Sequence, residues 1–461
     1  MMNVARRGAV AESGRFPNRD NHVNPPSVKW IDCLQYTAVT DVGMRRSNNQ
    51  DAHSVVLAKS EQLWPEQGHV LVVADGMGAH AAGELASEMA VRGVTLRFHQ
   101  YEELTHVEAL YKAIVETNVE IHQRGQANAD FHNMGTTISA LVLLPDGALI
   151  GHVGDSRIYR FRNDKLEQLT FDHSLVWELQ ASGQLSKNSE MVSMVPSNVI
   201  TRSLGPHAEV KVDIEGPFPV QQGDLFLLCT DGVSGMIEDE EIAAIIANLP
   251  TYEAAQFIVD LANIRGGSDN STVIVGLAAG EQITTREQAA DEEELEPVPV
   301  RRAHPAFWIS TMLLMLVAFF VKEKVGWLYG LPLAIISLLT LGAGIWHGRS
   351  YRQEQADNPR FIPPQGKGPY TNTQCKITRE FLTKLLENCR ELKKVAIENQ
   401  ATIEWDQFKN LTEQAAAAAK RKAYNEATRF YARAISFMMK EFRFQKLKQP
   451  GASLPADEQD D

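Results

Sequence analysis

The sequence has few cysteines, no excess of basic residues and no apolar leader, and each absence excludes a class of protein. The four cysteines show no CxxC spacing and are too sparse for a disulfide framework, which favours a reducing, intracellular compartment. A net charge of −13 argues against nucleic acid as a partner, because duplex binding draws on clustered Lys and Arg. The N-terminal segment 1–29 has no apolar run behind its arginines, so it predicts a disordered lead-in and not a secretory signal.

Several catalytic signatures are also missing. The sequence contains no P-loop, no kinase motif set and no GxSxG nucleophile elbow. Hydrophobic residues nevertheless make up 44% and charged residues 22%, which is a globular composition. A chain of 461 residues predicts two or three structural units.

Short apolar strands dominate the region from Trp30 to about Gly280. The runs are rich in Val, Ile, Leu and aromatic residues and end at Gly, Asp or Asn, which is typical of β-strands. Two stretches between them, 83–100 and 106–126, have helical periodicity. Many strands with few helices predict an α+β fold, a sandwich of two packed antiparallel sheets flanked by helices. The predicted strands are CLQYTAVTDVG, HVLVVADG, TTISALVLL, ALIGHVGDSRIYRFR, GDLFLLCTDG and STVIVGLAA.

Two long apolar runs follow an acidic linker. They occupy 304–321 and 325–346, and each is long enough to cross a hydrocarbon layer of about 30 Å. Arginines flank the pair on both sides, so the positive-inside rule places both soluble parts in the cytoplasm. The sequence therefore predicts a multi-pass cell-membrane protein with a two-span hairpin. A buried helical hairpin in a soluble core is the alternative.

The C-terminal region 376–448 has the periodicity of at least three helices and more basic than acidic residues. The stretch 411–435 resembles a tetratricopeptide-type helical hairpin. Its expected packing positions are Ala415, Ala427, Tyr431 and Ala434. We expect these helices to bind a protein partner or anionic lipid headgroups; a plain basic bundle is the alternative.

The strongest chemical signal is a set of aspartates placed where apolar strands end or begin. Asp75, Asp155 and Asp231 each close a predicted strand, and Asp269 opens one. If these strands share a sandwich, the carboxylates converge on one rim. Like charges at short range repel and raise one another's pKa, so such a group needs counter-charge.

Hard divalent cations supply that counter-charge. Mg²⁺ and Mn²⁺ prefer oxygen ligands and keep several waters, which suits the carboxylates together with the Gly76 carbonyl. Two such ions can share a bridging water, lower its pKa and present hydroxide to phosphorus. Arg46 is the candidate for holding the phosphate, because guanidinium offers paired donors. The adjacent Arg45 is its rival.

Seven short segments occur along about 240 residues of the chain. They are RRSNNQD (45–51), DGMGAHAAGELAS (75–87), GDSR (154–157), DHS (172–174), ITRSLG (200–205), CTDG (229–232) and SDNSTVIV (268–275). Their order resembles that of the motifs in the metal-dependent protein phosphatases, the type 2C or PPM family. The resemblance implies a β-sandwich with a two-metal centre that hydrolyses phosphoserine and phosphothreonine in proteins.

The resemblance also assigns roles to individual residues. Arg46 matches the phosphate-binding arginine, and Asp75 and the Gly76 carbonyl match ligands of the two-metal core. Asp231 and Asp269 match the downstream ligands. Asp155 matches the ligand of a third, weaker metal, and Asp51 matches an acidic position that supports the metal shell. Two positions depart from the family pattern: Gln50 stands where many members have Glu, and Met77 stands where animal members have a histidine proposed as general acid.

The sequence thus predicts one domain organisation and one main function, with one alternative function. The expected substrates are phosphorylated proteins; the alternative is a catalytically inactive, phosphatase-like membrane scaffold or phosphoprotein-binding module. The histidines His80, His152 and His173 are expected to form structural hydrogen bonds within loops. The expected boundaries are a disordered N-terminus at 1–29, a phosphatase domain at 30–280, an acidic linker at 281–303, a transmembrane hairpin at 304–347, a linker at 348–375, helices at 376–448 and an acidic disordered tail at 449–461.

Overall fold

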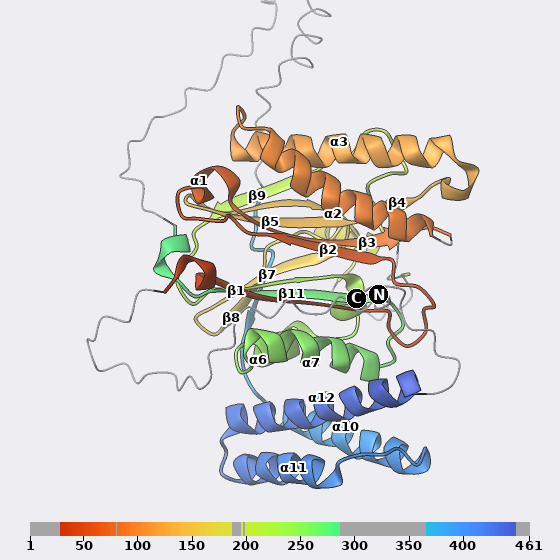
Figure 1. The fold of residues 1–461 in the computed structure, drawn as a ribbon, viewed down its shortest axis with the longest axis vertical. Coiled ribbons are helices and arrows are strands. Elements are labelled where there is room, and N and C mark those ends of the chain that lie inside the picture. The colour runs from red at the N-terminus through yellow and green to blue at the C-terminus, as the bar shows by residue number, and fades with distance from the viewer. Residues whose placement is uncertain (1–27, 80, 187–194, 197–198, 286–365, 449–461) are drawn as a thin grey trace, which may run out of the picture. The chain divides into compact units, whose positions relative to one another are not determined.

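A computed structural model describes residues 28–79, 81–186, 195–196, 199–285 and 366–448 (Figure 1). The chain divides into two compact units, one made of 1–287 with 363–461 and the other of 288–362, and the described residues belong to the first. The predicted spans at 304–321 and 325–346 lie outside the described residues. Among the helices that the structure describes, none combines the length and the apolar character needed to cross a bilayer.

Two antiparallel sheets form the centre of the unit (Figure 1). The strand order of the first is β1-β11-β10-β7-β8-β12, and that of the second is β2-β3-β5-β6-β9 with β4 paired to β3. The first sheet contains β1 (Leu34–Asp41), β7 (Arg157–Arg162), β8 (Lys165–Gln168), β10 (Leu225–Cys229), β11 (Ser271–Ala278) and β12 (Thr371–Gln374). The second contains β2 (Asp51–Val56), β3 (His69–Met77), β4 (Gly135–Thr136), β5 (Ile138–Leu144), β6 (Gly147–Val153) and β9 (Asp213–Phe218).

Helices cover the outer face of each sheet (Figure 1). The second sheet is covered by α2 (Ala82–Gln100) and α3 (His106–Ala127), and the first by α6 (Asp239–Ile246) and α7 (Thr251–Ile264). A further layer beyond α6 and α7 consists of α10 (Arg379–Glu398), α11 (Trp405–Lys420) and α12 (Tyr424–Lys448). The short helices are α1 (Trp64–Gln67), α4 (Leu175–Ala181) and α5 (Asp231–Ser234), with 3-10 turns at Trp30–Asp32, Ala129–Phe131 and Glu281–Ile283.

Local sequence explains why the strands and helices form where they do. Side chains of β3 alternate between two apolar cores: Val70 and Val72 pack under α2 and α3, whereas Leu71 and Val73 face the first sheet. The helix α3 begins at a capping box, in which the Thr105 hydroxyl and the Glu108 carboxylate bond each other's backbone N–H. The predicted sandwich of two antiparallel sheets flanked by helices is confirmed.

The six predicted strand runs all contain strands, and the two predicted helical stretches are α2 and α3. The run 148–162 is divided into β6 and β7, which belong to different sheets. The helices α6 and α7 were not predicted. The helix α7 is covered by β1 and β11 on one side and by α12 on the other, so most of its residues are buried. Its polar residues Gln256, Asp260 and Asn263 recur at helical spacing, a signal that the sequence reading did not use.

The C-terminal helices share a hydrophobic core with α6 and α7. Phe257 and Ile258 of α7 belong to the same buried cluster as Tyr431 and Ile435 of α12. The predicted packing positions are confirmed as buried. Several of the basic residues in this region are engaged internally: Arg433 forms paired hydrogen bonds of 2.8 and 2.9 Å with Glu253. The basic excess of the bundle is therefore partly balanced by the acidic surface of α7.

Candidate metal centre

Asp51 and Asp75 are directly opposite each other on neighbouring strands. Asp51 begins β2, and its Cα partner across the ladder is Asp75 near the end of β3. The next residue, Gly76, has no room for a side chain, because a Cβ would lie 2.0 Å from the Gly83 carbonyl oxygen. The ladder and this close packing together bring the start of β2, the end of β3 and the first turn of α2 to one point.

The remaining aspartates reach the same rim from other strands. Asp231 follows β10 and begins α5, Asp269 precedes β11, and β10 and β11 are paired. Asp155 follows β6 in a turn that requires Gly154, whose φ is +118° and whose Cβ would lie 2.5 Å from a Thr137 methyl. The predicted convergence of strand-end carboxylates is therefore found in the structure.

The pKa shifts of these aspartates show that the carboxyls lie close together and that little positive charge offsets their repulsion. Burial raises the pKa of Asp51 from its ordinary value of 3.8 to about 7, and the charges of Asp231 and Asp269 add to this rise. Burial and the charge of Asp231 likewise raise the pKa of Asp155 to about 7. Burial, the charges of Asp51 and Asp231, and a hydrogen bond with Asp231 raise the pKa of Asp75 well above its usual range. Burial also raises the pKa of Asp231 itself.

Three of these carboxyls have a buried oxygen without a hydrogen-bond partner. The atoms are Asp51 Oδ1, Asp155 Oδ1 and Asp231 Oδ1. Buried polar atoms are normally paired, so unpaired acceptors gathered at one rim fit a cation that takes oxygen ligands. Within the described residues, no three His, Cys, Asp or Glu side chains are already arranged as ligands around one point. Mg²⁺ and Mn²⁺ sites need fewer side chains than that, since carbonyl oxygens and waters complete the shell.

Arg46 is a basic residue at this rim, and its charge acts on Asp231. Its Nη2 lies 2.6 Å from Asp269 Oδ2, and its Nε donates to the Ser268 carbonyl at 3.4 Å. The side chain is 48% exposed, so its remaining donors face solvent, where a phosphate could approach. The rival Arg45 is also exposed, and its backbone N–H donates to the Gly267 carbonyl.

Two supporting residues were missed by the sequence analysis. The Thr230 hydroxyl donates to Asp51 Oδ2 at 2.8 Å, which leaves Oδ1 as the unpaired atom. The Asn270 side chain accepts from the Gln50 N–H and donates to the carbonyls of Val42 and Asn48, so it holds the loop that carries Arg46. Both residues lie beside predicted ligands in sequence, in CTDG and SDNST, and that adjacency was the available signal.

Two of the three histidines have structural hydrogen bonds, as expected. His152 Nε2 donates to the Phe171 carbonyl at 2.9 Å, and His173 Nδ1 accepts from the Gly154 N–H at 3.0 Å. His80 lies outside the described residues.

Comparisons with known proteins agree with this geometry. Residues 44–264 match the family described as protein phosphatase 2C. The chain is 37% identical over 244 residues to the protein phosphatase PhpP of Streptococcus pneumoniae, which covers 52% of this chain and 96% of that protein. It is 38% identical over 241 residues to the serine/threonine phosphatase stp of Listeria monocytogenes, which covers 51% of this chain and 92% of that protein.

Solved structures give similar matches. One is the catalytic domain of the serine/threonine protein phosphatase PstP in complex with two manganese ions; it is 31% identical, has a TM-score of 0.45, and covers 53% of this chain and 97% of that one. The sequence matches span nearly the whole length of the curated relatives at more than a third identity. The chain therefore belongs to the protein phosphatase 2C family.

Proposed function

We propose that this chain is a metal-dependent protein serine/threonine phosphatase that releases phosphate from phosphoserine and phosphothreonine. The observation that carries the proposal is the rim of buried, strand-end carboxylates with unpaired oxygens in a chain of this family. Asp51, Asp75, Asp155, Asp231 and Asp269 are the carboxylates available to hold Mn²⁺ or Mg²⁺, with Gly76 as the proposed carbonyl ligand.

Bound divalent cations would lower the pKa of a coordinated water and neutralise phosphate charge. The chain itself supplies positioning. Thr230 orients the Asp51 carboxylate, and Asp269 fixes the Arg46 guanidinium so that its free N–H groups point to solvent at the edge of the rim. Arg46 is proposed to bind two phosphate oxygens and to hold the phosphorus near the carboxylates. Met77 has no proton to give, so the leaving hydroxyl of serine or threonine must receive its proton from water or from another group.

The proposal is tested with the purified full-length chain and synthetic phosphopeptides. With added Mn²⁺ we expect phosphate release from phosphoserine and phosphothreonine peptides, and EDTA should abolish it. A phosphotyrosine peptide of the same sequence is the matched control for substrate class. Undiminished release after complete removal of metal, or no release under any metal condition, would refute the assignment.

We further propose that the runs 304–321 and 325–346 anchor the enzyme as a two-span membrane hairpin, with both soluble parts in the cytoplasm. Their length and the flanking arginines support this. The chain should remain with membranes after carbonate extraction, and deletion of 304–346 should release it. Recovery of the intact chain in the carbonate supernatant would contradict the anchor.

A further inference from the structure

The C-terminal part of the chain re-enters the catalytic sandwich beside both sheets. The Gly366 N–H donates to the Ile214 carbonyl of β9 at 2.9 Å, and the Tyr370 N–H donates to the Gln168 carbonyl of β8 at 2.8 Å. The following strand, β12, pairs with β8 as the edge of the first sheet. We call residues 366–374 the return segment. It contacts one strand of each sheet before the C-terminal helices begin.

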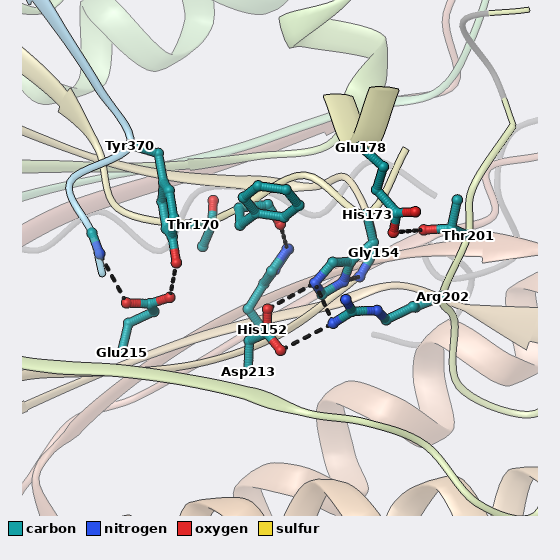
Figure 2. Close-up of polar contacts among 12 residues, drawn as sticks. His152, Gly154, Thr170, His173, Glu178, Thr201, Arg202, Asp213, Glu215 and Tyr370 are labelled. Atoms are coloured by element: carbon teal, nitrogen blue, oxygen red, sulfur yellow. Dashed lines mark hydrogen bonds and ion pairs between the residues drawn. The ribbon is translucent and has the colours of Figure 1, made fainter. Parts of the chain in front are cut away.

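A buried carboxylate receives the return segment. Glu215 in β9 is 1% exposed, and its Oε1 accepts a hydrogen bond from the Tyr370 hydroxyl (Figure 2). Its Oε2 accepts from the Gly368 N–H at 3.2 Å. Burial raises the pKa of Glu215, although the hydrogen bonds from Tyr370 and Gly368 oppose the rise. The donors that the described residues offer to this carboxylate therefore come from the return segment.

The Tyr370 ring also contacts the loop that follows β8. It packs edge-on against Phe171, with ring centroids 5.4 Å apart and an interplanar angle of 70°. The Phe171 carbonyl accepts from His152 Nε2, and the His152 ring stacks on His173 at 5.0 Å. Burial lowers the pKa of His152 to about 3, so this ring is neutral and donates through Nε2. Tyr370 is thus two contacts away from the histidine pair.

The histidine pair holds both neighbours of Asp155. His173 forms two hydrogen bonds with Gly154. Its backbone N–H donates to the Gly154 carbonyl at 2.8 Å, and its Nδ1 accepts from the Gly154 N–H. Because Nδ1 is an acceptor, Nε2 carries the proton and donates to Asp213 Oδ2 at 2.9 Å (Figure 2). On the other side, the Ser139 hydroxyl is within 2.9 Å of His152 Nδ1 and 3.1 Å of the Ser156 carbonyl.

This network continues to Asp75. The Ser156 hydroxyl lies 2.8 Å from the Thr137 hydroxyl, which accepts from the Asp75 N–H at 2.8 Å. The backbone around two of the proposed metal-binding carboxylates is therefore connected, by contacts given above, to the loop on which Tyr370 packs.

We propose that Tyr370 is a positioning residue for the phosphatase reaction. By bonding Glu215 and packing on Phe171, it holds the histidine pair against the Gly154–Ser156 turn, so the C-terminal part of the chain sets the geometry of the carboxylate rim. The predicted effect of Tyr370 on kcat rests on the proposed function. Its predicted effect on the rigidity of residues 152–157 does not.

The first test is amide hydrogen exchange in the metal-free, full-length chain, comparing Tyr370→Phe with the parent. This change keeps the ring on Phe171 and removes the hydroxyl from Glu215. We expect several-fold faster exchange in peptides covering 152–157. Tyr424→Phe is the matched control, because it removes another tyrosine hydroxyl from the C-terminal region, one that accepts from Arg379 Nε at 3.1 Å. Equal exchange of 152–157 in the two variants overturns the proposal.

The second test separates positioning from stability. With Mn²⁺ at saturation and below the melting temperature of each variant, Tyr370→Phe should lower kcat by about tenfold and leave KM for a small aryl phosphate unchanged. A lower melting temperature with unchanged kcat would mean a structural role only and would overturn the proposal. The double variant Glu215→Gln, Tyr370→Phe should show a kcat no lower than that of the worse single variant, since both substitutions remove the same contact. Additive decreases in kcat would contradict this.

The two hypotheses fail in different ways. If the parent chain releases no phosphate with Mn²⁺, the proposed function fails. Hydrogen exchange of 152–157 then still tests whether Tyr370 holds the Gly154–Ser156 turn. If the parent is active and Tyr370→Phe matches Tyr424→Phe in both exchange and kcat, only the positioning role fails.

Discussion

Two of the regions that hold buried acidic residues differ in where the positive counter-charge comes from. Under α12, Asp260 is fully buried and Arg443 of α12 pairs with it. On α6, burial would raise the pKa of Glu241, but the hydrogen bonds and charge of Arg265 outweigh burial and lower it. At the rim, the pKa values of Asp51, Asp75, Asp155 and Asp231 are all raised.

The difference teaches that arginines pair with the acids of α6 and α7, whereas the rim carboxyls lie close to one another and raise one another's pKa values. Isolated buried carboxylates are costly, and at Asp260 and Glu241 an arginine supplies the positive charge. At the rim Arg46 pairs with Asp269. Asp51, Asp155 and Asp231 each retain one unpaired oxygen. Perturbed acids of this kind are common at functional sites because the ligand completes them.

The largest effect is expected when a rim acid is neutralised. Asp231→Asn should reduce Mn²⁺-dependent phosphate release by about a hundredfold or more, because a metal ligand and its charge are lost. The metal-free variant should be more stable than the parent, since one repelling charge leaves the cluster. Both are measured, by phosphate release and by urea denaturation in EDTA. Parent-like turnover would show that Asp231 is not a ligand, and lower metal-free stability would show that the rim is not under repulsion.

The opposite result is expected where α12 packs on α7. Arg443→Met should destabilise the chain by about 3 kcal/mol, because it leaves the buried Asp260 carboxylate without its cation. Chemical denaturation of the full-length variant measures this. Arg433→Met is the matched control: its side chain is 45% exposed, and we expect a loss below about 1 kcal/mol. Equal losses in the free energy of unfolding would mean that burial does not make the Arg443–Asp260 pair more important than the Arg433–Glu253 pair.

A smaller effect is expected for Arg46, the arginine that pairs with Asp269. Arg46→Gln should lower kcat/KM for a phosphopeptide by about tenfold, mainly through KM, since a charged donor to phosphate is lost. Steady-state kinetics at saturating Mn²⁺ measure it, and Arg45→Gln is the paired comparison. A larger loss in Arg45→Gln would transfer the phosphate-binding role to Arg45.

The smallest effect is the pH dependence of stability without metal. The folded-state pKa values of Asp51 and Asp155 are raised from 3.8 to about 7, so the folded state binds more protons than the unfolded state between these values. Stability should therefore fall as pH rises from about 4 to about 7, by at least about 1 kcal/mol. Urea midpoints at pH 5.5 and pH 7.5 in EDTA measure the slope, and Asp231→Asn should flatten it. A midpoint that rises with pH in the parent would contradict the pKa directions.

Much of the sandwich and the candidate rim could be predicted from the sequence because the signals are local. Apolar β-type runs ending in Asp mark both a strand and the residue at its end, so Asp75 and Asp231 were found together with their strands. The helix α7 was not found, although its polar residues Gln256, Asp260 and Asn263 recur at helical spacing and its first acidic residue, Glu253, pairs with α12. Thr230 and Asn270 were also missed, because a hydroxyl or an amide acquires its role only from the partner it meets.

The sequence by itself determined which residues carry charge at strand ends, and hence the family and the chemistry of the rim. Only the tertiary structure decided how each acid is compensated. Arg443 lies 183 residues from Asp260, and Tyr370 lies 155 residues from Glu215. Pairs so distant in sequence leave no periodicity or spacing to detect, because they are selected by the packing of α12 on α7 and of the return segment beside β8 and β9. The C-terminal helices were predicted as a separate region, and their place beside the catalytic sandwich followed from those contacts alone.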